Sequence, residues 1–93
     1  MSQKYFSAVL KGDRNLNYFI SDYFSRFPNH NYSFTDDALV LELNSEDQPS
    51  AAFFLENILN FLVPKFLANS NKKKICFEAQ FEDRIVNCSY ELG

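Results

Sequence analysis

The sequence predicts an α+β domain of the ferredoxin-like, split βαβ type: a two-layer sandwich with a mostly antiparallel sheet, two helices on one face and an extra C-terminal strand. Apolar residues recur at helical spacing in two segments, and five other stretches have strand-like patterns. Their order is strand, helix, strand, strand, helix, strand, strand. At 93 residues the chain is long enough for one hydrophobic core, so we expect a single domain over residues 1–93.

The first strand is predicted at residues 4–10 (KYFSAVL), where apolar side chains on both faces favour an interior strand. A helix follows, with Asp13 in the N-cap position and Pro28 at its end. Its apolar positions are spaced by 3, 1, 3, 1 and 3 residues, which only a helix reconciles with one buried face. These positions are Leu16, Phe19, Ile20, Tyr23, Phe24 and Phe27.

Short, mostly alternating segments complete the predicted sheet. The first two are joined by a turn at residues 35–37 and the last two by a turn at residues 82–83. In the last pair, the apolar residues match across a hairpin. The alternation leaves one face of the sheet uncovered by helices. The four strands are predicted at residues 32–34, 38–43, 74–81 and 86–92.

The longest apolar stretch, residues 49–67, predicts the second helix, whose broad apolar face should cover the sheet. Ser45 and Gln48 have capping-box spacing at its start. Pro64 lacks the N–H of a helical hydrogen bond, so the helix either stops near Leu62 or kinks, and a kink is favoured. We expect no membrane span, because the stretch is too short and too interrupted by polar residues for the roughly 20 consecutive apolar residues required.

Composition and charge restrict the partners. The net charge is −3 and the pI is near 5.0, which disfavours nucleic acid and favours a basic protein. No N-terminal secretory pattern is present, so a cytoplasmic location is expected. Eleven Phe and five Tyr exceed the obvious needs of a core of this size, so some rings should lie on a contact surface.

No residue pattern indicates catalysis, a cofactor or a metal site. Cys76 and Cys88 fall on opposite faces of the predicted hairpin, which forbids a disulfide, and neither has a base or second ligand at a suitable spacing. His30, the only histidine, is expected to be solvated in a polar loop. With only Gly12 and Gly93, the chain cannot build a glycine-rich phosphate loop. We therefore expect no enzymatic activity.

The sequence favours a non-enzymatic protein-binding module, a small acidic inhibitor or immunity-type protein whose partner is another, basic, protein. Acidic turns and aromatic residues that point away from the apolar helix faces are the candidate contacts. The predicted partner-binding residues are Tyr18, Asp36, Asp37, Phe53, Glu82 and Asp83.

An alternative function is a small-molecule-binding or self-associating regulatory domain that uses the open face of the sheet. This hypothesis rests on analogy with other domains of the same strand order. It places Val9 and Val40 in a homodimer interface. A lysine at either position should weaken such a dimer, whereas changes in Tyr18 or the acidic turns should weaken binding to a different protein.

Overall fold

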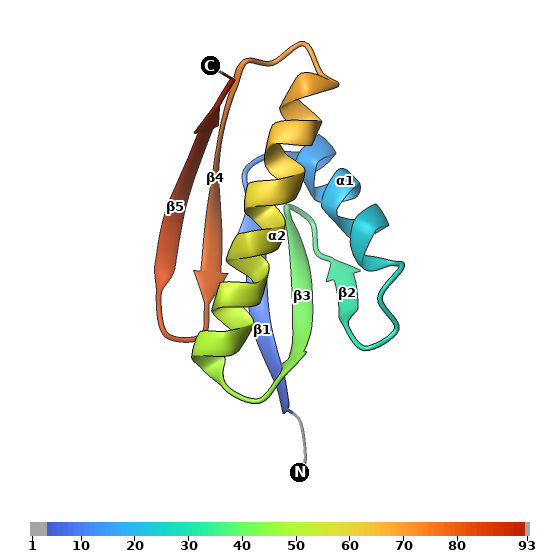
Figure 1. Cartoon of the computed structure of the whole chain (residues 1–93), viewed down its shortest axis with the longest axis vertical. Helices are drawn as coiled ribbons and strands as arrows, with labels where there is room; N and C mark the ends of the chain where they lie inside the picture. Colours follow the sequence, from blue (N-terminus) through green and yellow to red (C-terminus); the bar gives the residue numbers. More distant parts are fainter. Residues whose placement is uncertain (1–3, 93) are drawn as a thin grey trace.

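A computed structural model describes residues 4–92 of the chain, and its elements follow the predicted order (Figure 1). The predicted α+β class is confirmed, because two helices accompany a five-stranded antiparallel sheet. The elements are β1 (Lys4–Lys11), α1 (Arg14–Phe24), β2 (Asn31–Phe34), β3 (Ala38–Ser45), α2 (Gln48–Ala68), β4 (Lys74–Phe81) and β5 (Ile85–Glu91).

The strands lie in the order β2-β3-β1-β4-β5, and every neighbouring pair is antiparallel. β1 is therefore central, as the apolar groups on both of its faces predicted. The fifth strand widens the sheet beyond β4, so the two edges are formed by β2 and β5. In the β4–β5 hairpin, Ala79 pairs with Val86 and Phe77 with Cys88, which confirms the apolar matching predicted for this pair.

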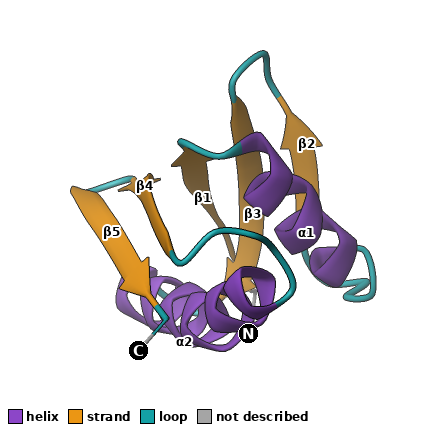
Figure 2. Ribbon diagram, turned by 90° about the horizontal axis from the view of Figure 1, so that it is seen from above, coloured by secondary structure: helices purple, strands orange, loops and turns teal. Residues whose placement is uncertain are grey.

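Both helices lie on the same side of the sheet, and the core fills the space between the two layers (Figure 2). The alternation of β3 points every second residue towards the helices, and these positions hold the buried Leu39, Leu41 and Leu43. The opposite face carries polar groups among its apolar ones. The largest fully buried side chains are Phe24, Leu10, Leu16, Ile20, Leu39, Leu41, Leu43, Leu55, Leu67 and Val63.

α1 begins as predicted and ends earlier. The Asp13 carboxylate accepts a hydrogen bond from the Leu16 N–H at 2.9 Å, which satisfies one of the free amides of the first turn. The helix stops at Phe24, short of Phe27. The Phe27 N–H bonds to the Phe24 carbonyl at 3.0 Å in a tighter turn, because a residue that precedes proline is pushed out of the helical region.

α2 differs from the prediction at its start. Asp47, not Ser45, is the N-cap residue, and it accepts a hydrogen bond from the Ser50 N–H at 2.8 Å. Ser45 instead ends β3, whose pairing with Lys4 on β1 extends that far. The capping-box spacing therefore misplaced the cap by two residues, because sheet pairing used Ser45 first.

α2 also continues past Pro64 to Ala68, so the helix does not stop near Leu62. Asn60, whose carbonyl loses its helical partner at Pro64, is exposed, and water can satisfy it. The helix has 21 residues and an 18-residue window of mean hydropathy 1.4, so by length and composition it would pass as a membrane span. The expectation that it is too short is wrong, although the core helix of a globular domain passes the same test and much of this one packs on the sheet.

Gly12 brings the connection between β1 and α1 close to β4. Its φ of +139° is rarely adopted by other residues, and a Cβ at this position would lie 2.9 Å from the Phe77 Cα. Lys72 then closes this end of the molecule through a short ion pair with Asp13. Burial would raise the pKa of Asp13, but the bonds from Lys72 and the Leu16 N–H outweigh it and lower the pKa.

Candidate functional site

The six predicted contact residues separate into two groups. Tyr18, Asp36 and Asp37 line one hollow between α1 and the β2–β3 turn. Phe53, Glu82 and Asp83 do not line it. Glu82 and Asp83 form the turn between β4 and β5, on the other half of the sheet (Figure 1).

Three exposed aromatic rings form a patch beside this hollow, and we call Tyr18, Tyr32 and Phe34 the aromatic patch. The Tyr18 and Phe34 ring centroids lie 5.1 Å apart, and those of Tyr32 and Phe34 lie 6.3 Å apart. The exposed fractions are 55% for Tyr18, 40% for Tyr32 and 45% for Phe34. Tyr32 and Phe34 pair with Leu41 and Leu39, so they are on the helix side of the sheet, but at its edge they are only half covered. The rings are thus held by one another while leaving apolar area free.

The acidic turn, Asp36 and Asp37, adjoins the aromatic patch. The Thr35 N–H bonds to the Ala38 carbonyl at 2.9 Å, which closes the turn and leaves both aspartates exposed. Within residues 4–92, neither carboxylate forms an ion pair. The hollow has a volume of about 270 Å³, and Arg14 contributes to its lining. We call the aromatic patch and the acidic turn together the aromatic–acidic surface.

Asn17 fixes the helix that carries Tyr18. Its side chain is buried and donates a hydrogen bond from Nδ2 to the Leu10 carbonyl at 3.2 Å, tying the first turns of α1 to β1. Tyr18, one residue further on, points outwards. Sequence reasoning missed Asn17 as a positioning residue, and it also missed Tyr32 and Phe34 as surface residues. Their alternation was visible in the sequence, but the edge position of β2 was not.

In the second group of predicted contact residues, the two acids already form hydrogen bonds within the molecule. The Glu82 Oε2 accepts a hydrogen bond from the Ser7 N–H at 2.8 Å. Asp83 accepts a long bond from the Gln48 Nε2 at 3.5 Å and lies 3.8 Å from the Arg84 guanidinium. These acids fasten the β4–β5 turn to its neighbours. Phe53, the third member of this group, lies on α2 with 68% of its surface exposed.

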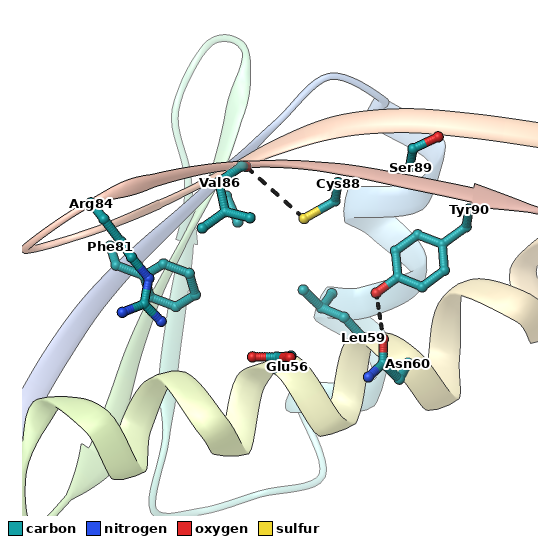
Figure 3. Close-up of a pocket in the computed structure, with 10 residues that line it drawn as sticks. Glu56, Leu59, Asn60, Phe81, Arg84, Val86, Cys88, Ser89 and Tyr90 are labelled. Atoms are coloured by element: carbon teal, nitrogen blue, oxygen red, sulfur yellow. Dashed lines mark hydrogen bonds between the residues drawn. The ribbon is translucent and has the colours of Figure 1, made fainter.

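A second cavity, of about 320 Å³, lies between α2 and the β4–β5 hairpin (Figure 3). The Tyr90 hydroxyl donates to the Asn60 Oδ1 at 2.7 Å across one end of it. Burial raises the pKa of the Cys88 thiol, and the Glu56 carboxylate adds to the effect. The thiol therefore stays protonated near neutral pH and is a poor nucleophile. Apolar walls come from Leu59, Ala79, Phe81 and Val86.

His30 is not solvated as predicted. Its Nδ1 accepts a hydrogen bond from the Asn44 N–H at 3.0 Å, and its ring stacks on Phe54 with centroids 4.9 Å apart. Burial lowers its pKa below the usual 6.5. The polar neighbours of His30 in the sequence predicted contact with water. Its hydrogen-bond donor is instead on β3 and the ring stacked on it is on α2, which no local pattern reveals.

The cysteines lie as predicted, on opposite faces of the β4–β5 hairpin. Cys76 pairs with Ser89 and Cys88 with Phe77, and both thiols are free. Among residues 4–92, no three His, Cys, Asp or Glu side chains are grouped so that they could hold a metal ion.

The open face of the sheet, on which the alternative function depends, has a small apolar centre. Val9 pairs directly with Val40 there, and both are half-buried. Ser7 and Glu42 form the next outward-facing pair, and Glu78 faces outwards from β4. Polar groups therefore surround the two valines closely, which makes this face a weaker candidate than the aromatic–acidic surface.

Comparison with known proteins finds no matching family model, no similar curated protein and no similar solved structure. Function must therefore be inferred from the residues of the surface themselves.

Proposed function

We propose that this protein is a non-enzymatic binding module, a small acidic inhibitor or immunity-type protein that binds a basic protein through its aromatic–acidic surface. The observation that carries the proposal is the contact of the half-exposed Tyr18 and Phe34 rings beside two aspartates that form no ion pair within residues 4–92. Aromatic anchors supply most of the affinity in many protein interfaces, and charge supplies steering and selectivity.

The chemistry of the surface defines the partner's contact group. An arginine or lysine of the partner could stack on the exposed rings while its charge meets the carboxylate of Asp36 or Asp37. Because the two rings already contact one another, little side-chain entropy would be lost on binding. A basic partner is consistent with the net charge of −3.

The finer fold assignment, a ferredoxin-like split βαβ domain with an added strand, belongs to the same proposal. Each helix connects two strands that are separated in the sheet by a single strand: β3 lies between β1 and β2, and β1 lies between β3 and β4. This arrangement supports two interlocked βαβ units with β5 added outside them. Such a fold serves many functions, so it carries no weight for the choice of partner.

We also propose that the protein acts in the cytoplasm and without catalysis, a cofactor, nucleic acid or a membrane. The free thiols of Cys76 and Cys88 suit a reducing compartment. The raised pKa of the Cys88 thiol and the hydrogen bond from the Asn44 N–H to His30 Nδ1 argue against a nucleophilic role for these two side chains.

The test is a tagged pull-down from a nuclease-treated extract of the protein's own organism, followed by affinity measurement with the purified partner. We expect one stoichiometric basic protein. Phe34→Ser should weaken its binding by at least about 30-fold, the effect of losing an interface anchor. The control is Phe53→Ser, which removes a phenylalanine that lies outside the surface and is more exposed, at 68% against 45% for Phe34.

A second pair of variants tests the contribution of the acidic turn to binding. Asp37→Lys should weaken binding and reduce its dependence on salt, whereas Glu46→Lys, an exposed acid outside the surface, should leave both nearly unchanged. Binding that survives Phe34→Ser and Asp37→Lys but is lost in Phe53→Ser would overturn the assignment of the surface. Recovery of the bait alone would overturn the binding function in that extract.

A further inference from the structure

The edge of the sheet formed by β5 lacks the features that usually prevent an edge strand from pairing with another chain. β5 runs for seven residues, Ile85–Glu91, and in both views no part of the described chain lies beyond it (Figures 1 and 2). Edge strands of monomeric proteins are usually short, or carry proline, lysine or a bulge that prevents pairing with another strand. β5, with the sequence IVNCSYE, has none of these, whereas β2 has only four residues. β5 is therefore a pairing site that the described residues leave open.

The hydrogen-bond phase of β5 shows which groups are free. Arg84 accepts from the Phe81 N–H at 2.7 Å, and Leu92 donates to the Lys73 carbonyl at 2.8 Å. In an antiparallel pair, alternate residues bond to the neighbour and the others point away, so the even-numbered residues of β5 bond to β4. The backbone N–H and C=O groups directed to the free edge belong to Ile85, Asn87, Ser89 and Glu91.

We propose that β5 pairs antiparallel with β5 of a second copy of this chain, about a twofold axis at Cys88, so that the two sheets become one. This register uses all seven residues of the strand, and any other twofold register shortens the overlap. Asn87 then faces Ser89 of the second copy and Ile85 faces Glu91 of the second copy. Both pairs are formed by residues whose backbone groups point to the free edge, as an antiparallel ladder requires.

The side chains agree with this register. The only charged residue of β5, Glu91, meets an apolar residue instead of its own copy, so no like charges oppose one another. On the helix-facing side, Val86 faces Tyr90 of the second copy and Cys88 faces Cys88 of the second copy. Moving the axis to Asn87 would bring Asp83 opposite Glu91 of the second copy, which like-charge repulsion disfavours.

The cavity beneath β5 also favours this pairing, because its apolar lining would be covered in the dimer. Val86, Cys88 and Tyr90 face α2 but are only half-buried, because the cavity separates them from Glu56 and Leu59 on the helix (Figure 3). A second β5 would place its own valine, cysteine and tyrosine next to these three. The two cavities would then meet at the axis, and apolar atoms now exposed at the edge would be covered.

The pairing does not depend on the proposed function. The aromatic–acidic surface is on β2 and α1, at the opposite edge of the sheet, so a dimer would present two such surfaces facing away from one another. Changes in β5 should alter the oligomeric state while leaving partner binding through Phe34 in place.

The test is the molar mass of the purified full chain, measured by sedimentation equilibrium over a range of concentrations. We expect a dimer, and we expect Asn87→Pro to raise its dissociation constant at least about tenfold by removing an edge hydrogen bond and inserting a ring. Because the Asn87 N–H points away from β4, the proline leaves the β4–β5 pairing intact, which far-ultraviolet circular dichroism can verify. The matched control, Asn87→Thr, keeps the N–H and should remain dimeric.

Oxidation by diamide tests the register. Two facing residues in a non-hydrogen-bonded pair have Cα atoms about 4.5 Å apart, within the range of a disulfide. Two Cys88 thiols would form one S–S bond and transfer two electrons and two protons to diamide, which becomes a hydrazine. Cys76→Ser should still give a covalent dimer, and Cys88→Ser should not.

Three outcomes would overturn the proposal. The wild-type chain could be monomeric at every concentration, the dimer could be indifferent to Asn87→Pro, or the cross-link could form through Cys76. A dimer that resists Asn87→Pro but dissociates in Val40→Lys would instead place the interface on the open face of the sheet.

Discussion

The two edges of the sheet are held to the helix layer in different ways. On the β2 side, the rings of Phe24, Phe27, His30 and Phe54 pack together between the sheet and the helices. Behind β5, a cavity separates strand and helix, and one side-chain hydrogen bond, from Tyr90 to Asn60, crosses it. The difference shows that a well-packed edge can serve as a rigid contact surface. An edge strand with a cavity behind it, in contrast, keeps free backbone groups with which another strand can pair.

The ring cluster behind β2 is continuous. Phe24 is fully buried and lies 6.0 Å from both Phe27 and His30, and His30 stacks on Phe54 at 4.9 Å, all between ring centroids. It joins α1, the following loop and α2. No comparable cluster lies behind β5 in the described residues, where Phe77 and Tyr90 form a single stacked pair with centroids 5.9 Å apart.

The largest effect is expected from breaking the ring cluster at its centre. Phe24→Ala should lower the free energy of unfolding by about 3–5 kcal/mol, because it removes a fully buried ring and leaves a cavity. Urea denaturation measures this change. Phe53→Ala, which truncates an exposed ring, should stay within about 0.5 kcal/mol of the wild type. Equal effects of the two substitutions would contradict the packing described for the β2 side.

An intermediate effect is expected at His30. His30→Ala should cost about 1–3 kcal/mol at pH 8, since it leaves the Asn44 N–H without its acceptor and removes the stack on Phe54. Asn29→Ala, at the exposed neighbour, is the control and should cost little.

We expect His30 also to make the stability of the protein depend on pH. Burial lowers the pKa of His30 in the folded state below 6.5, so the unfolded chain takes up a proton first as the pH falls. The contribution of neutral His30 to the free energy of unfolding is therefore fully present above about pH 6.5. Below that pH it decreases by at most about 1.4 kcal/mol per pH unit, until the pH has fallen past the pKa of His30 in the folded state. The lowered pKa of Asp13 acts in a more acidic range, since its usual value is 3.8. A slope between pH 7 and 5 that persists in His30→Ala would show that another group is responsible.

The smallest effect is expected behind β5. Tyr90→Phe removes the hydrogen bond to Asn60 but keeps the ring on Phe77, so it should cost about 0.5–1.5 kcal/mol. Tyr5→Phe, at a half-exposed ring, should change stability less. Thermal unfolding at fixed protein concentration resolves the difference, and a fixed concentration is needed because a dimer's melting temperature depends on it. A loss as large as that of Phe24→Ala would mean that the two edges are equally well anchored.

Periodicity predicted most of the fold because burial of one face imposes it. The spacing from Leu16 to Phe27 identified α1, and the alternation in residues 74–81 identified β4 with the bounds that the structure has. The residues at which the helices and strands begin and end were less predictable. Ser45 was assigned to a helix cap and belongs to β3, because a local capping pattern competes with sheet pairing that only the partner strand reveals.

The candidate site was half predictable. Tyr18 was recognisable because it is an aromatic residue that points away from the apolar face of its helix, and Asp36 and Asp37 because they form a turn. Their proximity to one another was not, and neither was the contribution of Phe34, because both depend on β2 lying next to α1 at an edge. The environment of His30 was predicted wrongly for the same reason, because the donor of its hydrogen bond, Asn44, and the ring stacked on it, Phe54, are 14 and 24 residues away in the chain.

By itself, the sequence determined the class of fold, the faces of its helices and strands, the hairpin register that separates the two cysteines, and the acidic character of its turns. These depend on local spacing, on pairing between adjacent strands and on charge, which the chain carries wherever it folds. Only the tertiary structure decided which strands became edges, which rings met and which polar groups found partners. Those outcomes depend on contacts between distant segments, whose positions are set jointly by the packing of the whole core.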